Sequence, residues 1–192
     1  MDWLDYEQAR GPQGVAELAR DLHVWPDYHG NRSPLADPQM RGLVTGLSLP
    51  QDTDPLTYLM AQYVAHIQAL ALGTRYIVER LQTEADYAFE AIYLCGGLQA
   101  NPLYVQAHAD VCQLPVVVPN TSECVAMGAA MLSAVGSGHF PTLPEAIAAL
   151  GPEGRRIDPR SELKDFFDKK YTVFRLLEKT QIDCRIIMQG KD

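Results

Sequence analysis

Two short apolar segments, separated by one helix-length stretch, limit what this 192-residue chain can fold into. Ala91–Cys95 and Leu114–Pro119 each have the length of a strand, and the second is β-branched and apolar on both sides, as a buried parallel strand would be. Segments with helical patterns lie before, between and after the two. This alternation of helix and strand predicts an α/β domain whose strands run parallel.

Capping signals locate the helices. Asp54 precedes Pro55, and an acidic or amide N-cap followed by proline is a common helix start. The same kind of pair begins a helix expected over Pro102–Cys112. After Asp54 an apolar repeat near 3.6 residues consists of Leu56, Leu59, Met60, Tyr63, Ile67, Leu70, Thr74, Ile77 and Leu81. Further helices are expected over Ser122–Val135, Pro144–Leu150 and about residues 163–185, the last with Phe167, Tyr171, Phe174 and Leu177 inward.

The first fifty residues are less regular. Residues 1–22 are polar and permissive for helix, and Val15, Leu18, Ala19 and Leu22 recur there at helical spacing. A loop rich in turn residues follows and leads to a glycine-bounded candidate strand, Gly42–Leu47. Near the other end, Gly151–Pro159 is rich in Gly, Pro and charge, and we interpret it as a weak boundary before the final helix.

Composition argues against several classes of function. The net charge is −8 at pH 7, which disfavours a nucleic-acid partner because such proteins need a basic face. No apolar run approaches the ~20 residues of a membrane span, and the acidic N-terminus lacks the pattern of a secretion signal. These features predict a cytoplasmic protein. Its four cysteines form no C-x-x-C pair, so we expect free thiols rather than zinc ligands.

The candidate functional feature is the turn after the first strand. Gly96 and Gly97 lack a Cβ and let another group approach the backbone closely. The helix that starts after Asn101 should present unpaired N–H groups. Together they indicate a nucleotide-binding edge, although a tight turn needs glycine, and Asn–Pro caps a helix, without any ligand. Neither a P-loop nor a G-x-G-x-x-G signature occurs in the chain.

Three other features have a functional and a structural interpretation. Gly128–Ala130 lies in an expected helix, where small residues either serve close packing or form the floor of an adenine-sized slot. The polar loop His29–Pro34 carries Arg32, which either donates hydrogen bonds to a phosphate or is an ordinary surface residue. His66 and His108 fall on expected helices, and we interpret them as helix-surface or core residues rather than ligands.

Several of these segments, in the same order, resemble the C-terminal, ATP-binding lobe of the FGGY carbohydrate kinase family. The likeness rests on Leu94–Leu103, Ala109–Asp110, Leu114–Val117 and Gly128–Ala130. Similarity to the FGGY domain-containing D-ribulokinase subgroup, which phosphorylates D-ribulose and related pentuloses, comes from His29–Asp37, Gly42–Leu47, Asp168–Tyr171 and Phe174. The resemblance covers residues 22–192 and leaves residues 1–21 as a non-matching N-terminal segment.

The resemblance implies a fold and a site. The fold would be an actin-like ATPase lobe, which is ribonuclease H-like, with a mixed sheet flanked by helices, and ATP and sugar would bind between two lobes. Gly96, Gly97 and Asn101 match the family segment that holds the adenosine end of ATP. The family's catalytic aspartate and first phosphate-binding motif have no match here. The resemblance therefore assigns this chain no catalytic and no metal-binding residue, and Mg²⁺ would be held with the other lobe.

The implied function is that of a carbohydrate kinase, a transferase that moves the ATP γ-phosphate to a hydroxyl of a pentulose, with D-ribulose as the expected sugar. Because the chain has less than half the length that the family needs, we expect a truncated protein that is inactive alone. An alternative is a non-catalytic isoform that acts as an interaction or decoy module and self-associates through an exposed lobe interface. Another enzyme built on the same lobe is a third interpretation, because a fold does not fix a function.

Overall fold

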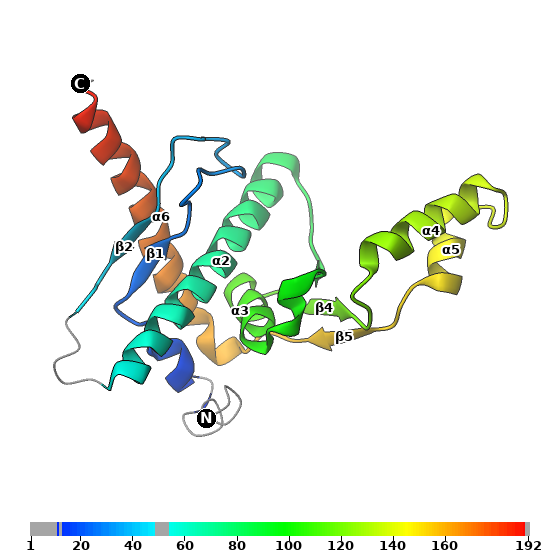
Figure 1. Cartoon of the computed structure of the whole chain (residues 1–192), viewed down its shortest axis with the longest axis horizontal. Coiled ribbons are helices and arrows are strands. Elements are labelled where there is room, and N and C mark those ends of the chain that lie inside the picture. The colour runs from blue at the N-terminus through cyan, green and yellow to red at the C-terminus, as the bar shows by residue number, and fades with distance from the viewer. Residues whose placement is uncertain (1–10, 12, 49–53, 191–192) are drawn as a thin grey trace.

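The computed structural model describes residues 11, 13–48 and 54–190, and Figure 1 shows a helical body joined to a protruding arm. We define the helical body as residues 13–48 with α2, α3 and α6, and the arm as residues 120–153. The elements, in chain order, are β1 (His23–Trp25), β2 (Leu43–Thr45), α2 (Pro55–Ala85), β3 (Ile92–Tyr93), the short 3₁₀ helix η1 (Gly97–Ala100), α3 (Pro102–Cys112), β4 (Val116–Pro119), α4 (Cys124–Gly136), α5 (Leu143–Leu150), β5 (Gly154–Ile157), η2 (Ser161–Leu163) and α6 (Lys164–Met188).

The larger core lies in the helical body, where α2 packs against α3 and α6 packs across β1. Trp25 of β1 is fully buried, and its ring lies 4.5 Å from that of Phe174 on α6. Phe167 and Leu177 of α6 are buried with them, as the expected inward face of the final helix requires, whereas Tyr171 is only half-buried. Aromatic rings of this size supply much of a core's apolar area, so this contact anchors β1 to α6.

A three-stranded sheet connects the body to the arm. β3 pairs in parallel with β4, with Ile92 opposite Val116, which confirms the expected parallel pair. The first strand is shorter than expected, since only Ile92 and Tyr93 of Ala91–Cys95 are extended. β5 pairs antiparallel with the other edge of β4, so the sheet is mixed. The stretch Gly151–Pro159, interpreted as a weak boundary, therefore contains a strand, and that interpretation was wrong.

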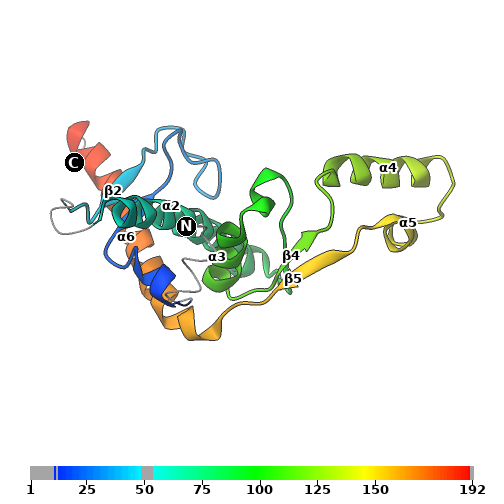
Figure 2. The same cartoon turned by 60° about the horizontal axis from the view of Figure 1, so that its bottom comes forward.

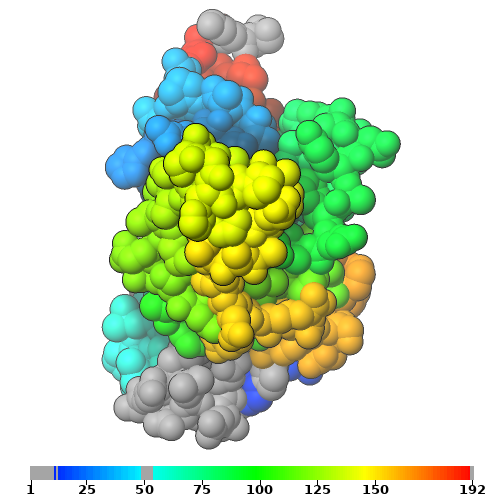
Figure 3. All heavy atoms as spheres, turned by 90° about the vertical axis from the view of Figure 1, so that its right-hand side faces the viewer, coloured from blue at the N-terminus to red at the C-terminus, as the bar shows by residue number. Residues whose placement is uncertain are grey.

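The arm extends away from the body in both Figure 1 and Figure 2. It consists of α4 and α5, which pack on each other, and Figure 3 shows their atoms in front of the body. Met131 is the one residue of α4 that the described chain buries, and Val125 remains 86% exposed. The arm thus presents a largely apolar helix to its surroundings.

The apolar repeat of α2 predicted the wrong face. Among the residues of that repeat only Ile67 is buried, whereas Leu56, Leu59, Tyr63, Leu70 and Leu81 are exposed. The buried face consists of Val64, Ala65, Ile67, Gln68, Ala69, Ala71, Leu72 and Tyr76. It is rich in alanine, which lets the neighbouring helices approach closely, and the larger side chains therefore point elsewhere.

The segment before α2 folds onto the body. Residues 13–17 are helical, and Val15, Ala19 and Leu22 are buried, which confirms the helical spacing. Lys170 of α6 is buried beneath this segment, and its Nζ donates to the carbonyl oxygens of Ala19 at 2.6 Å and Leu22 at 2.8 Å. The candidate strand Gly42–Leu47 is β2, which pairs antiparallel with β1, a strand that was not foreseen.

Candidate functional site

The glycine turn is open on its outer side. Gly96 has φ +94°, a conformation that L side chains rarely adopt, and Gly97 begins η1. A Cβ built on either glycine would meet no atom within 4 Å. The amides of Gly97 and Leu98 donate to no group in the described parts of the chain, because η1 bonds begin at the amide of Gln99, which donates to the Gly96 carbonyl. Two backbone donors beside a bare turn are thus available to a bound molecule.

Asn101 uses its side chain inside the protein. Its Oδ1 accepts from the amides of Leu103 at 3.1 Å and Tyr104 at 3.3 Å, and its backbone oxygen accepts from Val105. Pro102 has no N–H. The start of α3 therefore has no unpaired amide among the described residues, and the expectation of free N–H groups there was wrong. The reason is that a capping asparagine satisfies the helix by itself.

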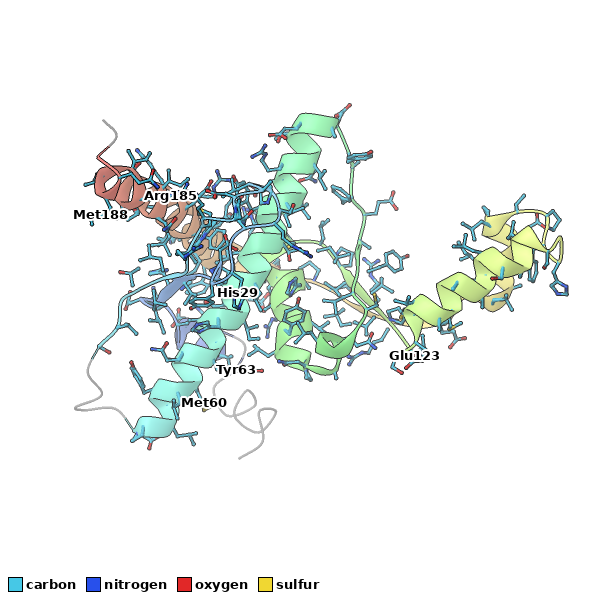
Figure 4. All side chains as sticks on the ribbon, turned by 45° about the horizontal axis from the view of Figure 1, so that its top comes forward. His29, Met60, Tyr63, Glu123, Arg185 and Met188 are labelled. Carbon is cyan, nitrogen blue, oxygen red and sulfur yellow. The ribbon has the colours of Figure 1, made fainter. Side chains whose placement is uncertain are left out.

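The side-chain nitrogen of Asn101, Nδ2, points away from the start of α3 and toward α2. It donates to the hydroxyl oxygen of Tyr63, at 2.5 Å, across the contact between α3 and α2. Figure 4 labels Tyr63 and Met60 on α2, and Glu123 where α4 begins. Tyr63 lies 38 residues before Asn101, and we had assigned it only to an apolar repeat. A tyrosine within an apolar stripe could have signalled it, since its hydroxyl needs a partner.

Gln99 ties the turn to the beginning of the arm. Its Nε2 donates to the carbonyl of Thr121 at 3.0 Å, and the Thr121 hydroxyl accepts from the Glu123 amide at 3.1 Å. The Oε1 of Gln99 is buried and has no partner among the residues that the structure describes. This loop-to-loop link fixes the glycine turn against the end of β4, and sequence reasoning had not assigned a role to Gln99.

The polar loop His29–Pro34 lies beside α2, about one helical turn after Tyr63. The hydroxyl of Tyr28 and Nε2 of His66 are 3.0 Å apart, while Asn31 is buried and donates from Nδ2 to Asp27 at 2.8 Å. Arg32 is exposed and makes no ion pair with a described residue. The structure does not bring Arg32 into contact with the glycine turn.

A cavity of about 240 Å³ separates this loop from α2 and α3. Asp27, Asn31, Thr74 and Tyr104 contribute its polar atoms, and burial raises the pKa of both Asp27 and Tyr104. Two of those polar side chains already make hydrogen bonds within the protein, because Asn31 donates to Asp27 and the Thr74 hydroxyl donates to the Leu70 carbonyl. The cavity therefore lies between packed elements, with part of its polar lining already used.

Among the remaining candidate residues, His108 has a structural role. His108 is buried, with Nδ1 at 2.8 Å from the Tyr104 carbonyl and Nε2 at 3.1 Å from the Thr74 hydroxyl, and burial lowers its pKa. This confirms its interpretation as a core residue. Burial raises the pKa of the Cys112 thiol to about 12, which leaves it unreactive near neutral pH. Gly128–Ala130 lies on α4 in the arm, and a Cβ on Gly128 would meet nothing within 4 Å.

The described residues contain neither a metal-binding cluster nor a membrane-spanning helix. No group of three or more His, Cys, Asp or Glu side chains lies close enough together to hold a metal ion within residues 11, 13–48 and 54–190. In the same residues, no helix combines the length and the apolar character that a membrane crossing requires.

Comparison with known proteins gives consistent matches. Residues 7–137 match the model of the "FGGY family of carbohydrate kinases, C-terminal domain". The chain is 51% identical to an FGGY carbohydrate kinase domain-containing protein of Xenopus laevis, over 96% of this chain and 32% of that protein. It is 34% identical to a D-ribulokinase of Saccharomyces cerevisiae, over 69% of this chain and 18% of that protein. The chain thus spans about a third of the length of the first of these relatives.

A solved structure supports the fold. Xylulose kinase from Rhodospirillum rubrum superposes with a TM-score of 0.67 and 24% identity, over 92% of this chain and 36% of that one. The neighbour is a sugar kinase, and together with the mixed sheet and its flanking helices it confirms the expected actin-like α/β lobe. With the family model matched across more than half of the chain, this protein belongs to the FGGY family of carbohydrate kinases and carries the C-terminal domain of that family.

Proposed function

We propose that the chain is the nucleotide-binding lobe of an ATP-dependent carbohydrate kinase. In the complete enzyme the γ-phosphate of ATP is transferred to a hydroxyl of a pentulose, with D-ribulose as the preferred candidate. Support for the sugar comes from two relatives named D-ribulokinase and ribulokinase, which are 34% and 36% identical to this chain. Support for the site comes from the open glycine turn beside Asn101, the single observation that carries the proposal.

Three residues take roles in nucleotide binding. The backbone of Gly96 and Gly97 lies against the nucleoside, since no side chain blocks its approach and the amides of Gly97 and Leu98 point to no described group. Asn101 supplies a side-chain N–H from Nδ2, because its Oδ1 is occupied by α3. The residues present fit one end of a nucleotide, with backbone and amide donors at a bare turn.

This chain alone has no sugar kinase activity under the proposal. Phosphoryl transfer depends on a positioned base and on charge neutralisation around the phosphates. The described residues contain no cluster suited to Mg²⁺, so the metal is held together with the rest of the complete enzyme. A coupled assay of ADP formation with D-ribulose should show no turnover by the purified chain, and turnover above background would refute this part.

Calorimetric titration with MgATP tests the site directly. The chain should bind saturably, and Asn101→Ser should weaken binding several-fold because serine keeps the helix cap but removes the amide donor. Asp54→Ala is the control, since it removes the N-cap of α2, where Asp54 bonds Thr57 and none of the three site residues. Absence of binding by a folded chain, or equal binding by wild type and Asn101→Ser, would contradict the assigned site.

Exposed apolar side chains favour a second function, that of a non-catalytic interaction or decoy module. Val125 and Leu132 of α4, in the arm, are 86% and 62% exposed. Single exposed apolar residues are ordinary, but a series of them along one arm is typical of an interaction surface. Sedimentation velocity across a range of protein concentrations distinguishes the two functions when combined with the titration. Association without nucleotide binding supports the module, and binding by a monomer supports the kinase lobe.

A further inference from the structure

The hydrogen bonds of Asn101 have a consequence for nucleotide specificity, which rests on the proposed function. A carbonyl oxygen has two lone pairs, and Oδ1 of Asn101 accepts from two amides, those of Leu103 and Tyr104. The orientation of the side-chain amide is therefore determined, because a flipped amide would direct NH₂ hydrogens at two N–H donors. As long as the cap of α3 stays intact, Asn101 has no acceptor left for a ligand.

Tyr63 binds the nitrogen of the same side-chain amide. Its hydroxyl oxygen lies 2.5 Å from Nδ2 and takes one of the two amide hydrogens. Tyr63 belongs to α2, the longest helix of the body, whereas Asn101 begins α3, so this bond joins two elements that pack tightly. Among the described residues Tyr63 is the one partner of Nδ2. The second amide hydrogen is what remains for a bound molecule.

An asparagine with both groups free recognises adenine at two points, accepting from the exocyclic amine and donating to a ring nitrogen. Asn101 cannot do so because its acceptor is occupied. A single N–H donor finds a ring nitrogen acceptor in adenine and in guanine alike. The neighbouring glycines contribute only backbone groups.

We propose that the cap bonds of Asn101 restrict its side chain to donating a hydrogen bond, with Tyr63 as a positioning residue that orients Nδ2, so that the site binds purine nucleoside triphosphates without distinguishing adenine from guanine. The chemical class of ligand is thus a purine nucleotide, with either base. This deepens the proposed function, because it concerns which nucleotides the same turn accepts.

The test is a pair of calorimetric titrations of the full chain, with MgATP and with MgGTP. The two dissociation constants should agree within about threefold, because a lone donor makes the same bond to both bases. Tyr63→Phe should weaken both by up to about fivefold, because Nδ2 loses the partner that orients it, and leave their ratio unchanged. Tyr58→Phe is the matched control on the same helix, and it should bind like the wild type.

A second measurement needs no nucleotide. In NMR spectra of the free chain, one side-chain amide proton of Asn101 should be protected from exchange by its bond to Tyr63. That protection should be lost in Tyr63→Phe and kept in Tyr58→Phe. A purely structural role for Tyr63 would lower the unfolding temperature of Tyr63→Phe and leave its affinities for both nucleotides unchanged.

The outcomes separate the two proposals. ATP binding at least tenfold tighter than GTP binding would overturn the specificity inference and leave the nucleotide site standing. Unchanged affinities for both nucleotides in Tyr63→Phe would overturn the positioning role. Failure of a folded chain to bind either nucleotide would overturn the proposed function and, with it, the specificity inference.

Discussion

The helical body and the arm use apolar side chains in opposite ways. In the body, Trp25, Met40 and Phe174 are almost completely buried, together with charged groups such as Asp110 and Lys170. In the arm, Val125 and Leu132 lie on the surface of α4, a helix that is no less apolar than the helices of the body. Burial, rather than composition, therefore decides where stability resides, because apolar surface contributes only when it leaves water. The body should fold and unfold as the cooperative unit, with the arm adding little to it.

The largest expected effect is the loss of a core aromatic ring. Trp25→Ala should lower the free energy of unfolding by about 3–5 kcal/mol, because it opens a cavity against Phe174. Leu132→Ala in the arm should cost under about 0.5 kcal/mol, as is usual for an exposed site. Urea unfolding followed by circular dichroism measures both. Similar losses in the two variants would show that the arm is part of the cooperative unit.

Ion pairs provide the next comparison. Asp110 is fully buried and accepts from the guanidinium of Arg160 at 3.0 Å and 2.7 Å and from its backbone amide at 2.8 Å. Arg160→Ala should cost about 3 kcal/mol because it leaves a buried carboxylate short of partners. Arg156→Ala on β5, which breaks the exposed pair with Asp158, should cost about 0–0.5 kcal/mol. Equal midpoints of urea unfolding for Arg160→Ala and Arg156→Ala would contradict the expected difference between the buried and the exposed ion pair.

Lys170 makes the stability of the body depend on pH. Burial lowers its pKa to about 8, from a usual value of 10.5. Between these two values the unfolded chain binds more protons than the folded one, so stability should rise with pH. The rise from pH 8 to 9.5 should be about 1–2 kcal/mol. Lys170→Met should flatten this slope, and parallel slopes for the two proteins would rule out Lys170 as the cause.

Helix caps give the smallest effects. Asn101→Ala should lower the free energy of global unfolding by about 1 kcal/mol, because α3 packs inside the body. Thr142→Ala, which removes the cap of α5 in the arm, should change it by under about 0.5 kcal/mol and act on local opening instead. Hydrogen exchange of the α5 amides detects the local effect. Loss of protection throughout the body in Thr142→Ala would contradict the division.

Local signals predicted much of this fold. The pairs Asp54–Pro55 and Asn101–Pro102 marked the starts of α2 and α3 correctly, because a cap and a proline act through neighbouring residues. β5 was missed because Gly154, Arg155 and Arg156 have no apolar pattern, and they are extended only through pairing with β4. The face of α2 that is buried likewise depends on packing between distant segments.

The candidate site divides in the same way. Gly96, Gly97 and Asn101 were visible in the sequence because turn and cap chemistry is local, and their ligand remains a prediction. Tyr63 and Gln99 were not visible, since each contributes through a bond to a residue more than twenty positions away. No spacing rule connects such positions, and only the fold brings them together.

The arm begins and ends at neighbouring residues of the sheet, at one end of the β4–β5 pair. Pro119 at the end of β4 lies opposite Gly154 at the start of β5, and the amide of Asn120 donates to the carbonyl of Glu153 at 2.8 Å. Everything between these positions is an excursion whose two ends are already neighbours. A tight hairpin could replace the entire excursion without changing the register of the sheet. The arm is therefore a module that can be exchanged, lengthened or trimmed, while the pairing of β4 with β5 holds its two ends together.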